Sequence, residues 1–222
     1  MLARVRTSEG AVTLLAGPCD RLPAVPETEY PEPIRRVVDA AAKKGVTLEI
    51  HVFDESTHTA EEAAHAVDAE LGQIVKSLVF VAPATDGTLS PVVCLVSGPN
   101  RVDLARLAAV LGEPEVRRAS AAEARELTGF VIGGIPPFAH GRQVRVVMDP
   151  DLGRFQTVWA AAGTPTAVFP VPPSVLRMLA NAHVAPIAEA RREADLLASE
   201  ATPAAEPAPA AEPAPAAEDA RV

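Results

Sequence analysis

The stretch from Gly72 to Pro83 constrains the fold most, because it is typical of a β-strand that is apolar on both faces. Successive side chains of a strand point to opposite faces. One face holds Ile74, Lys76, Leu78 and Phe80, and the other holds Val75, Ser77, Val79 and Val81. A strand of this kind predicts a sheet that is covered by other structure on each side.

Lys76 is the residue in this strand that needs an explanation. A buried ammonium group is costly unless an anion, a dipole or a water-filled cleft receives it, so Lys76 is a candidate functional residue. The alternative is a lysine at the end of a strand, whose four-carbon stem carries the charge to solvent. The segment alone favours neither interpretation.

Hydrophobic periodicity predicts helices and further strands on both sides of this segment. Helices are expected at residues 33–45, 59–70, 104–112, 120–128 and shortly after 172. Strands are expected at residues 46–52, 92–97, 144–148, 156–161 and 167–171, with a last apolar piece at 184–187. Thr59 and Ser120 each begin a capping box, the motif that opens many helices. We therefore predict an α+β (mixed α/β) fold, in which helices pack around a mixed, partly barrel-like β-sheet in a single domain.

The domain organisation follows from length and composition. The chain has 222 residues, of which 48% are hydrophobic, and this is enough for one sizeable core. We expect the folded domain to span residues 31–189. Residues 1–30 contain prolines and glycines without periodicity, which predicts an irregular N-terminal arm. Residues 199–222 repeat Ala, Pro and Glu, which predicts a disordered tail because few side chains there could form a core.

Several functional classes lack support in the sequence. The net charge of −9 argues against an extended nucleic-acid surface and against DNA binding, although contact with one end of a nucleic acid remains compatible with it. Cys19 and Cys94 form no CxxC pair and the five histidines lack ligand spacing, so we expect no metal and no cofactor. No run approaches the roughly 20 apolar residues of a membrane helix. These features favour a cytoplasmic protein without membrane contact.

A second unusual stretch is the loop from Gly133 to Gly141, with the sequence GGIPPFAHG. Gly133 and Gly134 let the backbone approach a ligand closely, and the prolines after Ile135 stiffen the loop. Such a loop can direct N–H groups at a carbonyl or phosphate oxygen. The alternative is a tight turn that binds nothing. His140 lies at the end of this loop, where it is either a pocket residue or an ordinary surface histidine.

Three stretches, in this order along the chain, resemble the YbaK/EbsC family of aminoacyl-tRNA editing domains: Thr59–Ala64, Gly72–Phe80 and Gly133–Pro137. That family includes free-standing deacylases and the editing insertion of bacterial prolyl-tRNA synthetases. The resemblance covers residues 31–189. It implies hydrolysis of the ester that joins a wrong amino acid to the terminal adenosine of a tRNA. The partners it implies are the acceptor end of the aminoacyl-tRNA and a cognate synthetase.

The resemblance also implies roles for individual residues. Lys76 would contact the terminal nucleotide, while Gly133 and Gly134 would hold the aminoacyl ester with backbone groups as a water attacks with help from the ribose hydroxyl. The expected substrate-binding residues are Thr59, Ile135, Pro137, His140 and Gly163. Some members carry an acidic residue in the segment that corresponds to residues 161–171, where this chain has Gly163, Thr164, Thr166 and Val168. This departure leaves the edited amino acid open.

The function we expect is that of a trans-editing aminoacyl-tRNA deacylase, a carboxylic ester hydrolase, acting on tRNA(Pro)-type substrates. A synthetase catalytic domain is not present in the sequence, which favours a free-standing protein. One alternative is a binding or regulatory module of the same fold, which recognises an aminoacyl-adenosine end or a protein partner without turnover. Another is a hydrolase of small esters that never meets tRNA.

Overall fold

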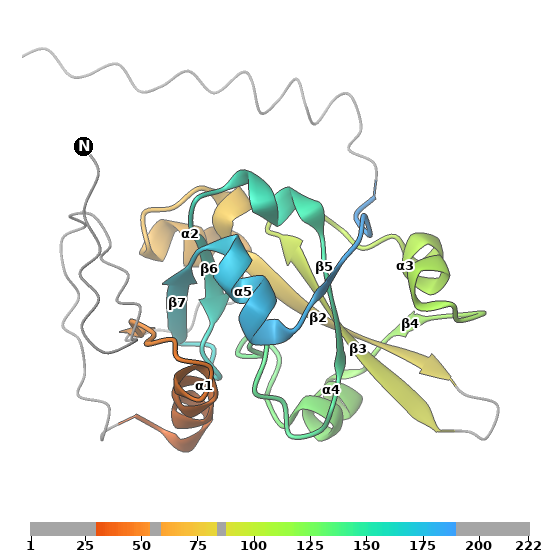
Figure 1. Cartoon of the computed structure of the whole chain (residues 1–222), viewed down its shortest axis with the longest axis horizontal. Helices are drawn as coiled ribbons and strands as arrows, with labels where there is room; N and C mark the ends of the chain where they lie inside the picture. The colour runs from red at the N-terminus through yellow and green to blue at the C-terminus, as the bar shows by residue number, and fades with distance from the viewer. Residues whose placement is uncertain (1–29, 54–58, 84–87, 190–222) are drawn as a thin grey trace, which may run out of the picture. The chain divides into compact units, whose positions relative to one another are not determined.

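A long antiparallel hairpin forms the centre of the fold in the computed structural model of the chain (Figure 1). β2 (Val75–Pro83) pairs with β3 (Leu89–Ser97) over its whole length, which places Lys76 opposite Val96. The structure describes residues 30–53, 59–83 and 88–189. The predicted arm, apart from Tyr30, and the predicted tail lie outside the described residues.

Two sheets contain the described strands. The larger sheet has the order β4-β2-β3-β5-β8, and the smaller one has the order β1-β7-β6. The other six strands are β1 (His51–Val52), β4 (Arg117–Arg118), β5 (Arg145–Met148), β6 (Val158–Ala161), β7 (Ala167–Val171) and β8 (His183–Val184). β5 runs parallel to both of its neighbours, and the remaining pairs are antiparallel. A bridge between Ile74 and Trp159 links the two sheets, neither of which closes on itself. The predicted mixed α+β class is confirmed, and its barrel-like character is limited to this link between two open sheets.

Helices begin and end where the sequence signals predict for α1, α3, α4 and α5. The helices are α1 (Glu32–Ala42), α2 (Ala60–Ala66), α3 (Leu104–Leu111), α4 (Ala121–Thr128) and α5 (Pro173–Ala180), with short 3-10 helices η2 (Leu71–Gln73) and η3 (Pro150–Arg154). Both predicted capping boxes are present: the Thr59 hydroxyl accepts from the Glu62 N–H, and the Ser120 hydroxyl accepts from the Glu123 N–H. These caps satisfy backbone donors that a helix leaves free at its first turn.

Two predicted elements are shorter in the structure. Of the strand expected at 46–52, only His51 and Val52 pair with a neighbour, although Val46, Leu48 and Ile50 are buried in alternation. An alternating pattern reports burial of one face, whereas a ladder also needs a partner strand, and only Ala167 and Val168 of β7 pair with this segment. The helix expected at 59–70 ends at Ala66, after which the chain turns through Asp68, with φ of +50°.

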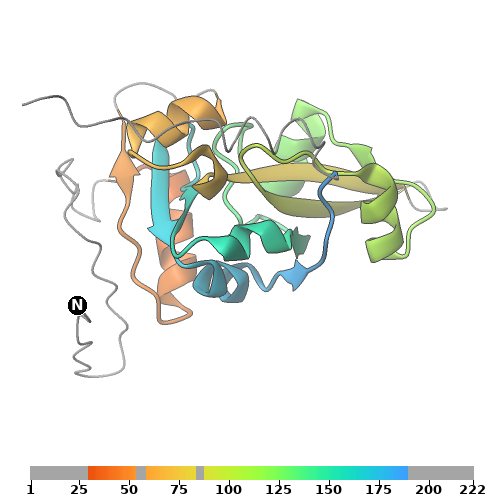
Figure 2. The same cartoon turned by 90° about the horizontal axis from the view of Figure 1, so that it is seen from above.

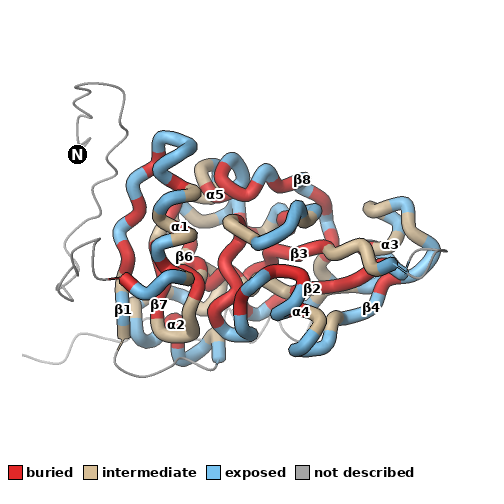
Figure 3. The backbone as a smooth tube through the Cα atoms, turned by 90° about the horizontal axis from the view of Figure 1, so that it is seen from below, coloured by how far each residue is buried: buried red, intermediate tan, exposed pale blue. Residues whose placement is uncertain are grey.

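Both faces of the central hairpin are buried, as the sequence predicts (Figure 3). Val75, Val79, Val93 and Leu95 face the larger core, which also contains residues of α1, α4 and α5. Phe80, Val92, Cys94 and Val96 face a smaller core that contains Leu107 of α3. Figure 2 shows α3 and α4 on opposite sides of the hairpin. By this alternation Lys76 belongs to the face that α3 covers, and Ser77 belongs to the opposite face.

Candidate functional site

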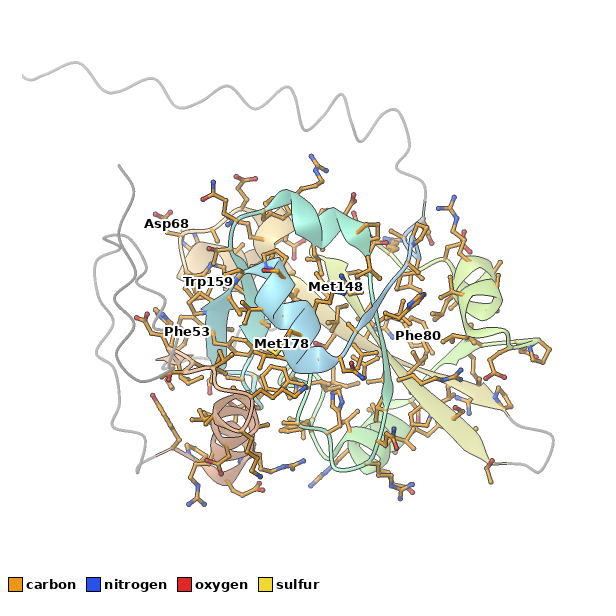
Figure 4. All side chains as sticks on the ribbon, viewed as in Figure 1. Phe53, Asp68, Phe80, Met148, Trp159 and Met178 are labelled. Atoms are coloured by element: carbon orange, nitrogen blue, oxygen red, sulfur yellow. The ribbon has the colours of Figure 1, made fainter. Side chains whose placement is uncertain are left out.

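The outer edge of β2 has a gap in its strand pairing. β3 occupies one edge of β2 throughout. On the other edge, Trp159 of β6 bridges to Ile74, and β4 pairs only with Phe80 and Val81. Figure 4 labels Trp159 and Phe80, which mark the two ends of this gap. The Ala119 N–H, just after β4, also donates to the Val79 carbonyl at 3.0 Å. Within the described part of the chain, no strand pairs with this edge of β2 between residues 75 and 78.

A cavity of about 220 Å³ lies at this gap. Its walls come from β2, β6, α4, the N-terminus of α2, the end of β4 and the loop that leads to Ile135. The lining residues are Thr59, Ala60, Ile74, Val75, Lys76, Ser77, Leu78, Val79, Arg118, Ala119, Ala124, Ile132, Gly133, Ile135, Trp159 and Ala161. The structure therefore brings together four of the residues that the sequence analysis singled out: Thr59, Lys76, Gly133 and Ile135.

Lys76 is half-buried, and its ammonium group is directed at a main-chain carbonyl. Nζ donates a hydrogen bond of 2.6 Å to the Asn100 carbonyl oxygen. Asn100 is itself buried, and its Nδ2 donates to Asp151 Oδ2 at 2.8 Å. Asp149 fixes this region, because its carboxylate accepts from the N–H groups of Asp151, Ile187 and Ala188. The lysine is thus held by a fixed turn and does not extend freely into solvent.

The electrostatics of the cavity favour an anionic ligand. Burial lowers the pKa of Lys76 below its usual value, the Glu61 carboxylate raises it, and Arg101 and Arg118 lower it further. A lysine in this environment lacks part of its hydration and gains from a negative charge nearby. Lys76 and Arg118 are the cations among the described lining residues, which include no carboxylate. The cavity is therefore suited to a phosphate or to a carbonyl oxygen that becomes negative during a reaction.

Glycines at three positions permit close packing of the loop that covers this cavity. Gly133 lines the cavity with φ of +91°, a conformation that other residues rarely adopt. Gly134 lies against the backbone of Thr164, and a Cβ atom at Gly134 would come within 2.6 Å of the Thr164 main chain. Gly163 has φ of +102°, and a Cβ atom there would lie 2.5 Å from the Pro33 carbonyl oxygen. Gly134, Pro137 and Gly163 do not line the cavity: Gly134 and Pro137 lie within the loop, and Gly163 packs against Pro33.

A family model described as "Aminoacyl-tRNA editing domain" matches residues 54–179, which is more than half of the chain and includes every residue that lines this cavity. The chain belongs to this family. The resemblance that the three sequence motifs indicate is thereby confirmed.

Relatives of this editing domain include characterised and uncharacterised proteins. YwhH of Bacillus subtilis (strain 168), an uncharacterised protein, is 33% identical over 125 residues, which are 56% of this chain and 76% of the relative. The "Multifunctional Ser/Thr-tRNA deacylase ProXp-y" of Escherichia coli (strain K12) is 31% identical over 130 residues, 58% of this chain and 77% of the relative. A crystal structure described as that of a candidate trans-editing enzyme for prolyl tRNA synthetase is 44% identical. It matches with a TM-score of 0.66 and covers 73% of this chain and 100% of its own.

Sequence reasoning missed several cavity residues of this editing domain. Trp159 and Arg118 come from β6 and β4, and nothing local in the sequence connects either with Lys76. Asn100, which holds Lys76 without lining the cavity, comes three residues after β3, and its role depends on a carbonyl group that no side-chain pattern reveals. Ser77 could have been identified from the sequence, because it is a polar residue on an otherwise apolar face of the strand.

His140 lies apart from the cavity that contains Lys76. It lines a larger cavity of about 750 Å³, together with residues of β3, β5 and the end of α5. Its Nε2 is 2.9 Å from the Pro136 carbonyl oxygen, which can only accept, so Nε2 carries the proton. Burial lowers the pKa of His140, the bond to Pro136 raises it, and Arg36 lowers it. Arg36 also donates to the Ala139 carbonyl at 3.1 Å, so two side chains restrain this end of the glycine–proline loop.

Replacing His140 by alanine should lower the free energy of unfolding by about 1–3 kcal/mol, because it leaves the carbonyl of the buried Pro136 without its donor. Equilibrium denaturation of the purified protein measures this change. His140→Gln, which keeps an amide donor, should lose less. Equal stability of wild type and His140→Ala would contradict the structural role assigned to this hydrogen bond.

Among residues 30–53, 59–83 and 88–189, no group of three His, Cys, Asp or Glu side chains is arranged to hold a metal ion. In the same residues, no helix is both long enough and apolar enough to span a bilayer. Cys94 is buried, and burial raises the pKa of its thiol well above the usual range, which disfavours the reactive thiolate.

Proposed function

We propose that this protein is a trans-editing aminoacyl-tRNA deacylase that hydrolyses the ester of a mischarged tRNA of the tRNA(Pro) type in the cytoplasm. The observation that carries the proposal is the cavity at the edge of β2, where Lys76 and the Gly133 loop meet and no described lining residue is acidic. The deacylase and trans-editing descriptions of relatives support it. Its partners would be the acceptor end of the tRNA and a cognate synthetase, and the net charge of −9 argues against DNA.

Ester hydrolysis requires little from the protein beyond orienting the water and the ester and stabilising the charge that develops. A water oxygen bonds to the ester carbonyl carbon, the bond from that carbon to the ribose oxygen breaks, and the ribose oxygen leaves with a proton. Negative charge develops on the carbonyl oxygen, and the main-chain N–H of Gly133 together with the Lys76 cation is suited to stabilise it or the neighbouring nucleotide. We assign Thr59 and Ile135 to the cavity wall. Gly134, Pro137, Gly163 and His140 would act by fixing the shape of the loop.

Amino acid release from a panel of acylated tRNA(Pro) tests the proposal. The panel holds alanyl-, cysteinyl-, seryl- and threonyl-tRNA(Pro), with prolyl-tRNA(Pro) as the cognate control. We expect at least one mischarged member to be hydrolysed faster than in buffer and faster than the cognate ester. If no member exceeds its rate in buffer, the enzymatic proposal fails. Tight binding of a non-hydrolysable aminoacyl-adenosine without turnover would then favour the binding module, and hydrolysis of small esters that uncharged tRNA does not inhibit would favour the small-ester hydrolase.

The pH dependence of deacylation should report the unusual environment of Lys76. If the protonated ammonium is the active form, the enzymatic rate falls as the pH rises through the pKa of Lys76. Because burial lowers this pKa, the fall should come below the value of about 10.4 for a free lysine. The measurement is kcat/KM against pH, after subtraction of spontaneous ester hydrolysis. Lys76→Arg keeps its charge over this range, so a fall of the same shape in that variant would assign it to another group.

A further inference from the structure

Arg36, on α1, lies at the neck of the segment that contains the glycine–proline loop. This segment closes on itself, because the Gly141 N–H donates to the Thr128 carbonyl at 2.8 Å and so joins its two ends. The Arg36 guanidinium group donates to the Gly129 carbonyl at 3.4 Å and to the Ala139 carbonyl at 3.1 Å. One side chain from another element therefore bridges both ends of the segment.

The neck is shaped to receive this guanidinium group. A Cβ atom at Gly129 would lie 3.2 Å from Arg36 Nη2, and a Cβ atom at Gly141 would lie 3.7 Å from the same nitrogen. The Phe130 ring also faces the group, with its centroid 4.4 Å from Cζ, and an aromatic face attracts a cation placed over it. Two carbonyl groups, two glycines and an aromatic ring of the neck thus surround one arginine.

The backbone at Ala139 indicates that this neck depends on outside support. Ala139 has φ of +66°, in the left-handed region, which is unfavourable for a residue with a Cβ atom. Such a conformation persists only where the surrounding structure holds it. The hydrogen bond from Arg36 to the Ala139 carbonyl is one such restraint. Without it, Ala139 is freer to relax toward a negative φ, which would redirect the chain at this end of the loop.

A movement of the neck would reach the cavity that contains Lys76. Ile132, Gly133 and Ile135 line this cavity, and the two carbonyl groups that Arg36 holds flank them in the sequence. Arg36 itself does not line the cavity, so it acts on the site through the loop. It also lies outside residues 54–179, so the family match assigns no role to it.

We propose that Arg36 is a positioning residue, which fixes the neck of the loop so that the main-chain N–H of Gly133 keeps its place at the cavity. Arg36 contacts neither the ester nor the tRNA in this role. The inference rests on the proposed function, since it takes the Gly133 N–H as a group that stabilises the charge developing on the ester. A displacement of about 1 Å in such a group is enough to cost about two orders of magnitude in rate.

Deacylation kinetics of the full chain give the first test. Arg36→Ala should lower kcat by roughly 10- to 100-fold and leave KM near the wild-type value, because the lost contribution belongs to the transition state. Arg36→Lys keeps the charge but lacks the planar fork that reaches two carbonyls, so it should recover only part of kcat. Arg35→Ala, which removes an exposed arginine from the same helix, is the matched control and should keep the wild-type kcat.

Amide hydrogen exchange of the ligand-free protein gives a second test that does not depend on turnover. Within residues 129–141, the Gly134 N–H donates to the Val131 carbonyl and the Gly141 N–H to the Thr128 carbonyl. Peptides covering these residues should exchange roughly 10-fold faster in Arg36→Ala, because the loop opens more often. Peptides of β2 should keep their wild-type exchange rates, which separates a local role from a general loss of stability.

Three outcomes would overturn the inference. The first is a wild-type kcat in Arg36→Ala. The second is loop exchange that is unchanged, or that rises equally in β2. The third is an Arg36→Lys variant that matches the wild type while Arg36→Ala raises KM alone, as a charge contact with the tRNA would require. Faster exchange confined to the loop, in a protein that deacylates no tRNA of the panel, would overturn the proposed function and still support the role of Arg36 in fixing the loop.

Discussion

Lys76→Ala is expected to lower kcat/KM for deacylation by roughly 100-fold, which corresponds to about 2.7 kcal/mol of transition-state stabilisation. The Lys76 ammonium is half-buried, its pKa is lowered by burial, and it is held by the Asn100 carbonyl, while Lys76 itself lines the cavity. A preorganised cation in such a place stabilises developing negative charge without any cost of reorientation during the reaction. Steady-state deacylation of the best substrate in the tRNA(Pro) panel measures the effect.

Lys44→Ala is the matched control for this prediction. The Lys44 ammonium also donates to main-chain carbonyls, those of Met178 and Leu179, but Lys44 lies outside the cavity. The control should keep the wild-type kcat/KM, even if it loses some stability. If Lys76→Ala hydrolyses the substrate at the wild-type rate, Lys76 does not take part in catalysis.

Gly134→Ala should also reduce kcat/KM by about 100-fold, although Gly134 does not line the cavity. A Cβ atom at this position would approach the Thr164 backbone to 2.6 Å, and neither backbone can yield as a flexible side chain could. The loop must then shift, and with it the main-chain N–H of Gly133. A displacement of about 1 Å in a positioning element is enough to cost about two orders of magnitude in rate.

The control for Gly134→Ala is Gly153→Ala in η3. A Cβ atom at Gly153 would meet nothing within 4 Å, and its backbone does not need a positive φ. The same added methyl group should therefore leave kcat/KM and the melting temperature close to wild type. If the two alanine variants behave alike, the close contact between the loop and Thr164 does not position the site.

Local features of the fold could be predicted from the sequence because their causes are local. The capping boxes at Thr59 and Ser120 and the apolar hairpin strands depend on side chains a few residues apart. The short pairing of residues 46–52 could not be predicted in the same way. It depends on where this segment meets β7, which lies more than 100 residues further along the chain.

The site was predictable only in part for the same reason. The proximity of Lys76 to the Gly133 loop could be predicted only from a family resemblance, since Gly133 lies 57 positions after Lys76 and no periodicity connects the two. Arg118 and Trp159 enter the cavity because the edge of β2 is left open between β4 and β6, which is a property of the assembled sheets. The position of Gly134 against Thr164 depends on tertiary packing between two loops, and no pattern within either loop encodes it.

The open edge of β2 also has a mechanical consequence. The two sheets are linked through the Ile74–Trp159 bridge, and the cavity walls come from both of them. A ligand in this cavity touches both sheets at once, so separating them would require its release. Bound ligand should therefore make the two sheets unfold as one cooperative unit, with a gain in stability that grows with ligand concentration.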